Sequence, residues 1–367
     1  MLKRRIKRIT IKNYRSITDL TVEMPDLMVL VGENGSGKSN FVDALRFLSD
    51  AMYKLHDAIS KRGNMHILRN DVDNLSIYFE IEVEIDAINY NYGFEVREEE
   101  FYYVIQKEFY KKEGELILDY NEVWKIRPNN LSLEAPNQFL SLPLLVDYPD
   151  YAPTVHFLRD LSFFTLNPTI LKDPVQTLTI PAKLSESGEN LTSVLYDIKK
   201  NFEHIDSTIT EYLSLLMPNI VSYDFGSIGR FIYIILKHQN GHHFDLSQES
   251  DGTRRVLAML TALLQPQTPS LLAIEEPELF IHPGILAMLC EFIDEASLRQ
   301  QIIVTTHSPD LIAKFDVNAI RVVEMTDNGT VIDMLDDRLL EIVNQKLFNT
   351  SDILSIEGRL RRKQHDS

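Results

Sequence analysis

The sequence predicts an α/β fold with a mixed sheet, an antiparallel β subdomain and a helical lid, and no long coiled coil. Three observations lead to this prediction. An apolar strand, a glycine-rich loop and a helix follow one another at residues 27–48. Residues 76–118 then alternate between apolar and polar side chains with period two. After residue 251 the chain returns to alternating helices and strands, and we find no sustained heptad run in the sequence.

The first predicted strands come before the loop. Between residues 6 and 11, isoleucines alternate with basic or polar residues, which is typical of a half-exposed strand. Residues 20–24 continue this pattern and end in the turn dipeptide Pro25-Asp26. Residues 27–31 are all apolar and predict a buried strand, and the helix after the loop should run to about residue 62.

The loop at residues 32–39 reads G-x-x-x-x-G-K-S between that strand and that helix. Its glycines let backbone N–H groups turn inward around phosphate oxygens, and the helix N-terminus adds partial positive charge. Lys38 should reach the β- and γ-phosphates, and the Ser39 hydroxyl should hold Mg²⁺. The predicted nucleotide-binding residues are Asn34, Gly35, Ser36, Gly37, Lys38, Ser39 and Asn40.

The middle of the chain predicts a β meander followed by a helical lid. Residues 129–174 form the longest proline-dense stretch and predict loops with short elements. Helical periodicity runs from residue 184 to 216 and stops at Pro218, and a strand pair follows at residues 220–237. The meander strands are predicted at residues 76–85, 89–96, 101–107 and 115–118.

Two further strands end in polar residues of the kind that a nucleotide site needs. Residues 271–274 are apolar and lead into Glu275 and Glu276. Because strand ends of parallel sheets lie beside the phosphate loop, Glu275 should hold the metal, and Glu276 should act on the attacking water as its base. The strand at residues 301–305 leads to His307, which can hydrogen-bond the γ-phosphate and sense its loss.

Taken together, these motifs resemble the P-loop NTPase fold of ABC-type ATPase heads, in the branch of the SMC and RecF-like proteins. Within that branch they are most similar to stand-alone AAA-type ATPases and to the ATPase domain of OLD-family nucleases. The likeness covers most of the chain in the order of the family, and the residues between about 75 and 240 match only in general character. The matching segments are residues 11–17, 32–39, 250–253, 275–278, 282–283 and 305–309.

The resemblance implies an ATPase that uses ATP and Mg²⁺ and dimerises head to tail. The ATP on one phosphate loop is then capped by the signature loop of the other head, and residues 278–283 touch the partner. Two residues depart from the common family pattern: Asp251 replaces a glycine, and Glu275 replaces an aspartate. The glutamine loop of the family has no clear counterpart, since Gln106 lies in a predicted strand. The signature residues, acting in trans, are Ser250, Asp251, Gly252 and Thr253.

We therefore expect residues 1–367 to form a single ATPase head built from four parts. Residues 1–74 hold the N-terminal strands, the phosphate loop and its helix, and residues 75–128 the meander. Residues 129–240 form the helical lid insertion, and residues 241–367 carry the signature, the acidic strand, the partner-touching segment and the histidine. A last strand pair is expected within that final part, around a turn at residues 327–329.

Composition and charge limit the classes of protein and the partners that fit this chain. The net charge of −17 argues against a generally basic DNA-coating protein. The basic clusters at residues 3–8 and 359–363 could contact nucleic acid or simply be solvated, and the acidic run at 95–100 reads as a solvated sheet face. Cys290 lies in an apolar helical stretch, so we interpret it as a core residue. One cysteine and the absence of a long apolar run indicate a cytoplasmic protein without a membrane span.

The sequence favours an ATPase that controls a separate effector, a nuclease or toxin, in DNA repair or anti-phage defence. The acidic pairs at residues 71–73 and 336–337 read as solvated loops, so we expect no nuclease centre in this chain. The alternative is an ATP-gated DNA clamp of the RecF and SMC type. A transporter subunit or a small-molecule kinase fits the signature and His307 less well. The expected partners are a second copy of the chain and an effector protein, with nucleic acid left open and no membrane.

Overall fold

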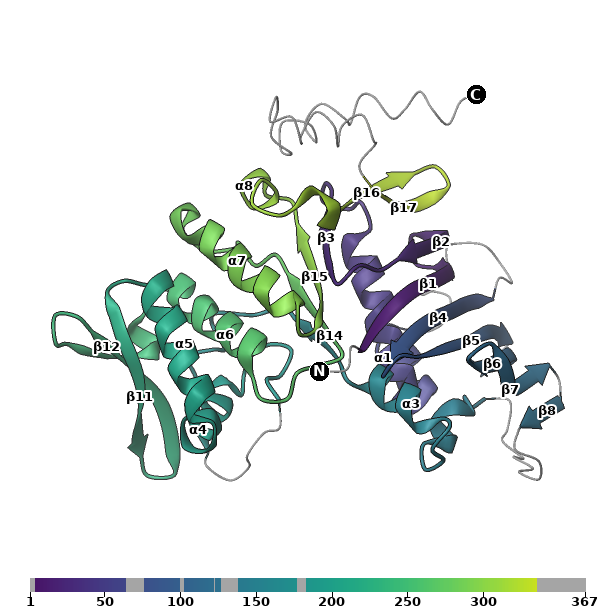
Figure 1. Cartoon of the computed structure of the whole chain (residues 1–367), viewed down its shortest axis with the longest axis horizontal. Helices are drawn as coiled ribbons and strands as arrows, with labels where there is room; N and C mark the ends of the chain where they lie inside the picture. The colour runs from purple at the N-terminus through teal and green to yellow at the C-terminus, as the bar shows by residue number, and fades with distance from the viewer. Residues whose placement is uncertain are drawn as a thin grey trace. The chain divides into compact units, whose positions relative to one another are not determined.

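The computed structural model describes residues 4–63, 76–99, 102–121, 123–126, 138–176 and 183–334. The chain divides into two compact units, each built from segments that are distant in sequence (Figure 1). Unit 1 consists of Met1–Leu161, Ser270–Leu272 and Asn318–Asp336. The described residues of unit 2 lie within Ser162–Pro269 and Ala273–Val317. The acidic pairs at 71–73 and 336–337 and the basic cluster at 359–363 lie outside the described residues.

Unit 1 contains a seven-stranded antiparallel sheet in the order β2-β1-β4-β5-β6-β7-β8. The predicted meander is confirmed, and β4 shows why its sequence has period two, since every second residue of that strand is buried. The sequence did not predict that β4 also pairs with β1, which joins the N-terminal strands and the meander into one sheet. The strands are β1 (Arg4–Tyr14), β2 (Ile17–Glu23), β4 (Ile77–Ile85), β5 (Ile88–Glu99), β6 (Tyr102–Lys112), β7 (Glu115–Asn121) and β8 (Val123–Ile126).

A second sheet region of unit 1 positions the phosphate loop. Strand β3 (Leu27–Val31) is buried at every residue and leads into the loop, and helix α1 (Lys38–Ser60) follows it. Strand β16 (Ile320–Thr326) pairs parallel with β3 and antiparallel with β17 (Gly329–Asp333), so this sheet is mixed, as predicted. Unit 1 also contains the helix α3 (Ala152–Arg159) and the 3₁₀ turn η1 (Leu142–Leu145).

The core of unit 1 packs α1 against the large antiparallel sheet. Tyr14 of β1, Phe47 of α1 and Phe79 of β4 form a cluster with ring centroids 5.3–5.5 Å apart. All three rings are at most 1% exposed. Aromatic rings at such distances add favourable edge and stacking contacts to the burial of their apolar area. The helix that carries the loop is therefore fixed by the core of the unit.

Unit 2 contains the described helices that follow α3, together with part of a sheet and a small antiparallel sheet. Strands β15, β14 and β9 are neighbours in that order, and the small sheet has the order β10-β12-β11, with β13 paired to β12. The first residues of β9 and β14 are assigned to unit 1. The strands are β9 (Leu161–Phe164), β10 (Val175–Gln176), β11 (Ile220–Ile228), β12 (Phe231–His238), β13 (His243–Asp245), β14 (Leu271–Glu275) and β15 (Gln301–Thr306).

The helical structure expected at residues 184–216 is confirmed, and it consists of two helices. A break at Phe202, whose φ is −135°, separates α4 from α5. The helices are α4 (Leu191–Asn201), α5 (Glu203–Leu216), α6 (Asp251–Leu264), α7 (Leu286–Ser297) and α8 (Pro309–Ile312), with 3₁₀ turns η2 (Leu246–Gln248), η3 (Pro283–Ile285) and η4 (Val317–Ala319).

Cys290 is buried in α7, as predicted, and burial raises the pKa of its thiol to about 12. Gln106 lies in β6, again as predicted. Among the described helices, none combines the length and the apolar character needed to cross a membrane.

Candidate functional site

The predicted phosphate loop has the expected local structure. Chain direction changes between β3 and α1 through Gly35 and Gly37, whose φ values of 83° and 108° lie in the left-handed region that glycine adopts without strain. Lys38 is only 7% exposed and its Nζ donates hydrogen bonds to the carbonyl oxygens of Gly32, at 2.7 Å, and Glu33, at 2.9 Å. The side chain of Lys38 thus lies against the loop that it follows.

The residues of this loop fit a phosphate group. Ser36 is 6% exposed, and within the described part of the chain its Oγ has no hydrogen-bond partner. A buried hydroxyl without a partner costs free energy, which an oxygen-rich ligand at the loop would recover. Asn34, Gly35 and Ser39 are exposed at the same loop. The loop therefore combines accessible residues, a lysine and an unsatisfied hydroxyl at the N-terminus of a long helix.

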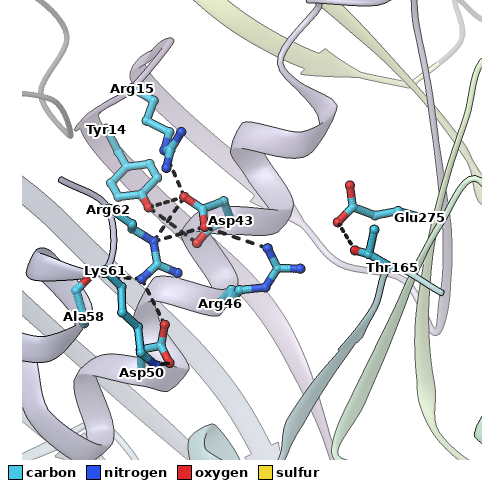
Figure 2. Close-up of polar contacts among 10 residues, drawn as sticks. All are labelled: Tyr14, Arg15, Asp43, Arg46, Asp50, Ala58, Lys61, Arg62, Thr165 and Glu275. Atoms are coloured by element: carbon cyan, nitrogen blue, oxygen red, sulfur yellow. Dashed lines mark hydrogen bonds and ion pairs between the residues drawn. The ribbon is translucent and has the colours of Figure 1, made fainter. Parts of the chain in front are cut away.

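Asp43 of α1 lies at the centre of a charged cluster that the sequence did not reveal (Figure 2). Its Oδ2 accepts a hydrogen bond from the Tyr14 hydroxyl at 2.7 Å and forms an ion pair with Arg15 Nε at 2.9 Å. Its Oδ1 accepts from Arg62 Nε at 3.0 Å, and Arg62 also binds Asp50 at 2.9 Å. Burial, and then the charge of Asp43, raise the pKa of Tyr14. This cluster ties the helix behind the loop to the turn after β1.

In unit 2, Glu276 and His307 come together as the two polar ends of neighbouring strands. His307 Nδ1 lies 3.2 Å from Glu276 Oε1, and the Glu276 N–H donates to the Thr305 carbonyl at 2.9 Å. Glu276 has a φ of 47°, which is left-handed and unusual for a residue with a side chain. Glu275 Oε1 accepts a hydrogen bond from Thr165 Oγ1 at 3.2 Å (Figure 2).

Arg255 holds the strained Glu276 peptide, and the sequence did not point to it. This arginine of α6 is 3% exposed, and its Nη2 donates to the Glu276 carbonyl at 2.9 Å. Its Nη1 donates to the Leu166 carbonyl at 2.5 Å, while its Nε is buried without a hydrogen-bond partner among the described residues. Burial lowers the pKa of Arg255. A charged residue directly before the apolar helix run at residues 256–260 was the available signal.

Glu278 connects the acidic segment to the strand end that carries His307. Its Oε1 accepts from Thr306 Oγ1 at 2.5 Å, and that same threonine oxygen accepts from the Ser308 N–H at 2.9 Å. The other carboxylate oxygen, Oε2, is buried and has no partner in the described ranges. Burial raises the pKa of Glu278. The turn around His307 is thus fixed from both sides.

The predicted signature residues form the start of α6. Ser250 Oγ accepts from the Thr253 N–H at 3.1 Å, which caps the helix, and Asp251 pairs with Arg254 at 2.8 Å. A Cβ added to Gly252 would lie 2.4 Å from the Phe280 carbonyl oxygen, so this position requires glycine. Phe280 is 63% exposed and has a φ of 64°.

The predicted residues thus form two sets. Asn34, Gly35, Ser36, Gly37, Lys38, Ser39 and Asn40 belong to unit 1. Ser250, Asp251, Gly252, Thr253, Glu275, Glu276 and His307 belong to unit 2. Within each unit they gather as described, and a site shared by the two sets stays a prediction.

Comparison with known families gives a match over residues 27–313 to the family described as "AAA domain, putative AbiEii toxin, Type IV TA system". The Old nuclease of Escherichia phage P2 is 24% identical over 89% of this chain. Endonuclease GajA of Bacillus cereus (strain VD045) is 23% identical over 84% of it. The chain spans only 60% and 56% of the lengths of these two relatives.

Solved structures with the same fold include SMC heads. An SMC head bound to the C-winged helix domain of ScpA gives a TM-score of 0.60 at 17% identity, over 92% of this chain and 99% of that one. An SMC head with an extended coiled coil from Pyrococcus furiosus gives 0.59 at 14% identity, over 94% and 100%. The chain therefore belongs to the family described as "AAA domain, putative AbiEii toxin, Type IV TA system", is an ATPase similar to the Old and GajA nucleases over most of its length, and has the fold of an SMC head.

Proposed function

We propose that the chain hydrolyses ATP as a head-to-tail homodimer and thereby controls a separate effector, a nuclease or toxin, in DNA repair or anti-phage defence. The observation that carries this proposal is the Glu276–His307 pair, 3.2 Å apart, in a chain that also has a complete phosphate loop. A carboxylate held by a histidine at a strand end is suited to orient water and to take up its proton.

Each residue has a proposed task in that reaction. Lys38 and the loop N–H groups bind the phosphates, and His307 hydrogen-bonds the γ-phosphate. Glu276 orients the attacking water and accepts its proton. Ser39 and Glu275 would hold Mg²⁺, which supplies positive charge against the phosphates. Strained backbone at Glu276 is consistent with a catalytic residue, because such conformations cluster at functional sites.

The proposed dimer contact uses the start of α6 and the segment after Glu276. The Ser250 hydroxyl, the Gly252 backbone and the helix N-terminus would cap the ATP of the partner head. Leu279 and Phe280 are 37% and 63% exposed, and a second copy of the chain would cover them. ATP then bridges two surfaces, and its hydrolysis releases them.

The effector proposal rests on the relatives. Two of them are named as nucleases and match most of this chain, while the chain spans little more than half of each. One SMC head of the same fold was solved with a domain of ScpA, so a head of this fold binds another protein. We propose that the present chain likewise works with an effector, and in the cytoplasm.

The Glu276→Gln variant tests the proposal. Its amide keeps the shape of the carboxylate and cannot accept the proton, so hydrolysis should fall by about 10²-fold or more while ATP still binds. Light scattering should then show a stable dimer with Mg²⁺ and ATP. Lys38→Ala, which weakens ATP binding, should stay monomeric under the same conditions. A Glu276→Gln protein that remains monomeric with ATP would rule out the dimer mechanism.

The second candidate is an ATP-gated DNA clamp. DNA replication and repair protein RecF of Streptococcus agalactiae is 35% identical over 68 residues, 18% of either chain, which favours it. The basic strand β1 argues against it, because Arg5 pairs with Glu84 at 3.0 Å and Arg8 pairs with Glu82. DNA binding that needs ATP and weakens with salt would support the clamp. No binding at low salt would exclude it.

A further inference from the structure

Two hydroxyls connect the phosphate loop to the last described strand of the chain. Thr330 of β17 is 2% exposed, and its N–H donates to the Ser16 carbonyl at 2.8 Å. Its Oγ1 lies 2.7 Å from Ser16 Oγ and donates to the Ser36 carbonyl at 3.4 Å. Ser16 Oγ in turn accepts from Asn40 Nδ2 at 2.6 Å. All of these residues belong to unit 1.

The donors and acceptors fix one direction for this chain of bonds. A hydroxyl has a single proton to donate, and Thr330 gives its proton to the Ser36 carbonyl. With the Thr330 proton used in this way, the Ser16 hydroxyl supplies the proton of the Ser16–Thr330 bond, and it also accepts from Asn40. The bonds therefore run from Asn40 through Ser16 and Thr330 to Ser36, and they bridge residues 36 and 40 from outside the loop. Bonds aligned in this way strengthen one another.

Close packing supports the same bridge. A Cβ added to Gly37 would lie 2.2 Å from Thr330 Oγ1, and one added to Gly32 would lie 2.3 Å from the Val323 carbonyl oxygen. Both glycines of the motif thus lie directly against the β16–β17 hairpin. Gly37 begins α1 without a side-chain cap, so the loop has little support of its own at that point.

We propose that Thr330 and Ser16 are positioning residues that hold the loop in its phosphate-binding shape before ATP arrives. This inference rests on the proposed ATP binding. A glycine-rich loop loses much conformational freedom when it closes on a ligand, and a preformed loop has already lost it. Loss of the bridge should therefore weaken ATP binding in the ground state and the transition state alike. The Michaelis constant rises and kcat stays the same.

The test compares three hairpin variants. Thr330→Val keeps the side-chain shape and removes the hydroxyl, and we expect about a tenfold rise in both KM and the dissociation constant of a fluorescent ATP analogue. Thr330→Ser keeps the hydroxyl and should stay within about twofold of wild type. Thr326→Val is the matched control, because Thr326 Oγ1 donates at 2.8 Å to Gly329 within the hairpin turn. It should bind ATP as wild type does.

Hydrogen exchange of the loop amides gives a readout that needs no ATP. Thr330→Val and Ser16→Ala should each speed exchange at residues 33–37, and the double variant should add little, because both break one bridge. If Thr330→Val does not fold, Ser16→Ala carries the same test. Wild-type ATP affinity together with unchanged exchange would overturn the bridge. If the variants exchange faster but the wild-type protein binds no ATP, the proposed function is wrong and the bridge is supported.

Discussion

The phosphate loop of unit 1 and the acidic segment of unit 2 are held in different ways. Around the loop, the contacts that brace it from outside are neutral: the hydroxyls of Ser16 and Thr330, and the close packing of two glycines against the β16–β17 hairpin. Around Glu276, the contacts are charged, with buried Arg255 on its carbonyl and His307 on its carboxylate. A binding loop needs a fixed shape, whereas a catalytic carboxylate needs a fixed charge. The molecule meets these two demands with different chemistry.

The charged region around Glu276 also contains more features that lower the stability of the fold. Arg255 Nε and Glu278 Oε2 are buried without partners within the described part of the chain, and Glu276 has left-handed backbone. Each such feature lowers stability by about 1–3 kcal/mol. We infer that these unfavourable features are retained because they position Glu276. Substitutions in this region should therefore change the ATPase rate more than they change the free energy of unfolding.

Arg255→Met should have the largest effect. Without the Arg255 guanidinium, the Glu276 carbonyl loses its hydrogen-bond donor and the Glu276 side chain can shift. A displacement of the base by about 1 Å lowers kcat about 10²-fold. The free energy of unfolding should fall by only about 1–3 kcal/mol, because the carbonyls of Leu166 and Glu276 lose a donor while the cost of a buried charge is removed. Steady-state kinetics and urea unfolding measure the two quantities.

Arg321→Met is the matched control for this change. Arg321 is also buried, and its Nη1 donates to the carbonyls of Asn318 and Ile320 at 2.8 and 2.9 Å, in unit 1. It should leave kcat as in wild type. If both variants lose activity equally, or if Arg255→Met loses stability in proportion to its rate, the distinction between the two regions fails.

Asp43→Asn tests the charged cluster on α1. The change removes the carboxylate that Arg15 and Arg62 share, and the free energy of unfolding should fall by about 2 kcal/mol. The hydroxyl bridge is intact, so ATP affinity should change much less. Asp19→Asn, which breaks an exposed pair with Lys12, should cost about 0.5 kcal/mol or less. A large loss of ATP affinity at constant stability would show that charge also shapes the loop.

Gly252→Ala tests the packing between the signature residues and the segment after Glu276. The added methyl group meets the Phe280 carbonyl at 2.4 Å, and one of the two must move. We expect a loss of about 1 kcal/mol in unfolding free energy and a lower ATPase rate. Gly284→Ala is the control, since its nearest neighbour is a His282 ring atom at 3.1 Å. Equal behaviour of the two variants would contradict the proposed contact.

Glu278 should give the smallest effect, visible as a dependence of stability on pH. Burial raises the pKa of its carboxyl above 4.5, so the folded state binds this proton more tightly than the unfolded state. The resulting stabilisation is complete below pH 4.5 and is lost as the pH rises through the raised pKa. Between pH 4.5 and pH 8, wild type should lose stability relative to Glu278→Gln in urea unfolding. A constant difference would contradict this sign.

The parts that the sequence predicted are those fixed by neighbouring residues. The phosphate loop and its strand and helix depend on a contiguous motif, and Glu275, Glu276 and His307 stand at the ends of apolar runs. The period of β4 likewise identified its strand, but pairing with β1 joins residues more than sixty positions apart. The alternation of apolar and polar residues within a strand does not identify the distant strand with which it pairs.

The supporting residues were missed for the same reason. Thr330 lies 294 positions from Ser36, and no local pattern marks it. Arg255 stands next to the predicted signature, but its partner Glu276 is 21 positions away and uses only its backbone carbonyl. A contact to a carbonyl leaves no trace in the type of the partner residue, so side-chain chemistry alone could not identify it.

The position of Thr330 late in the chain has a consequence for synthesis. A ribosome that adds about 5–20 residues per second needs about 15–60 seconds to pass from Ser36 to Thr330, 294 residues later. During that time the nascent chain already displays the complete G-x-x-x-x-G-K-S motif, but not the strand that braces it. A nascent chain should therefore capture nucleotide only weakly, and full affinity should arise when the β16–β17 hairpin has left the exit tunnel.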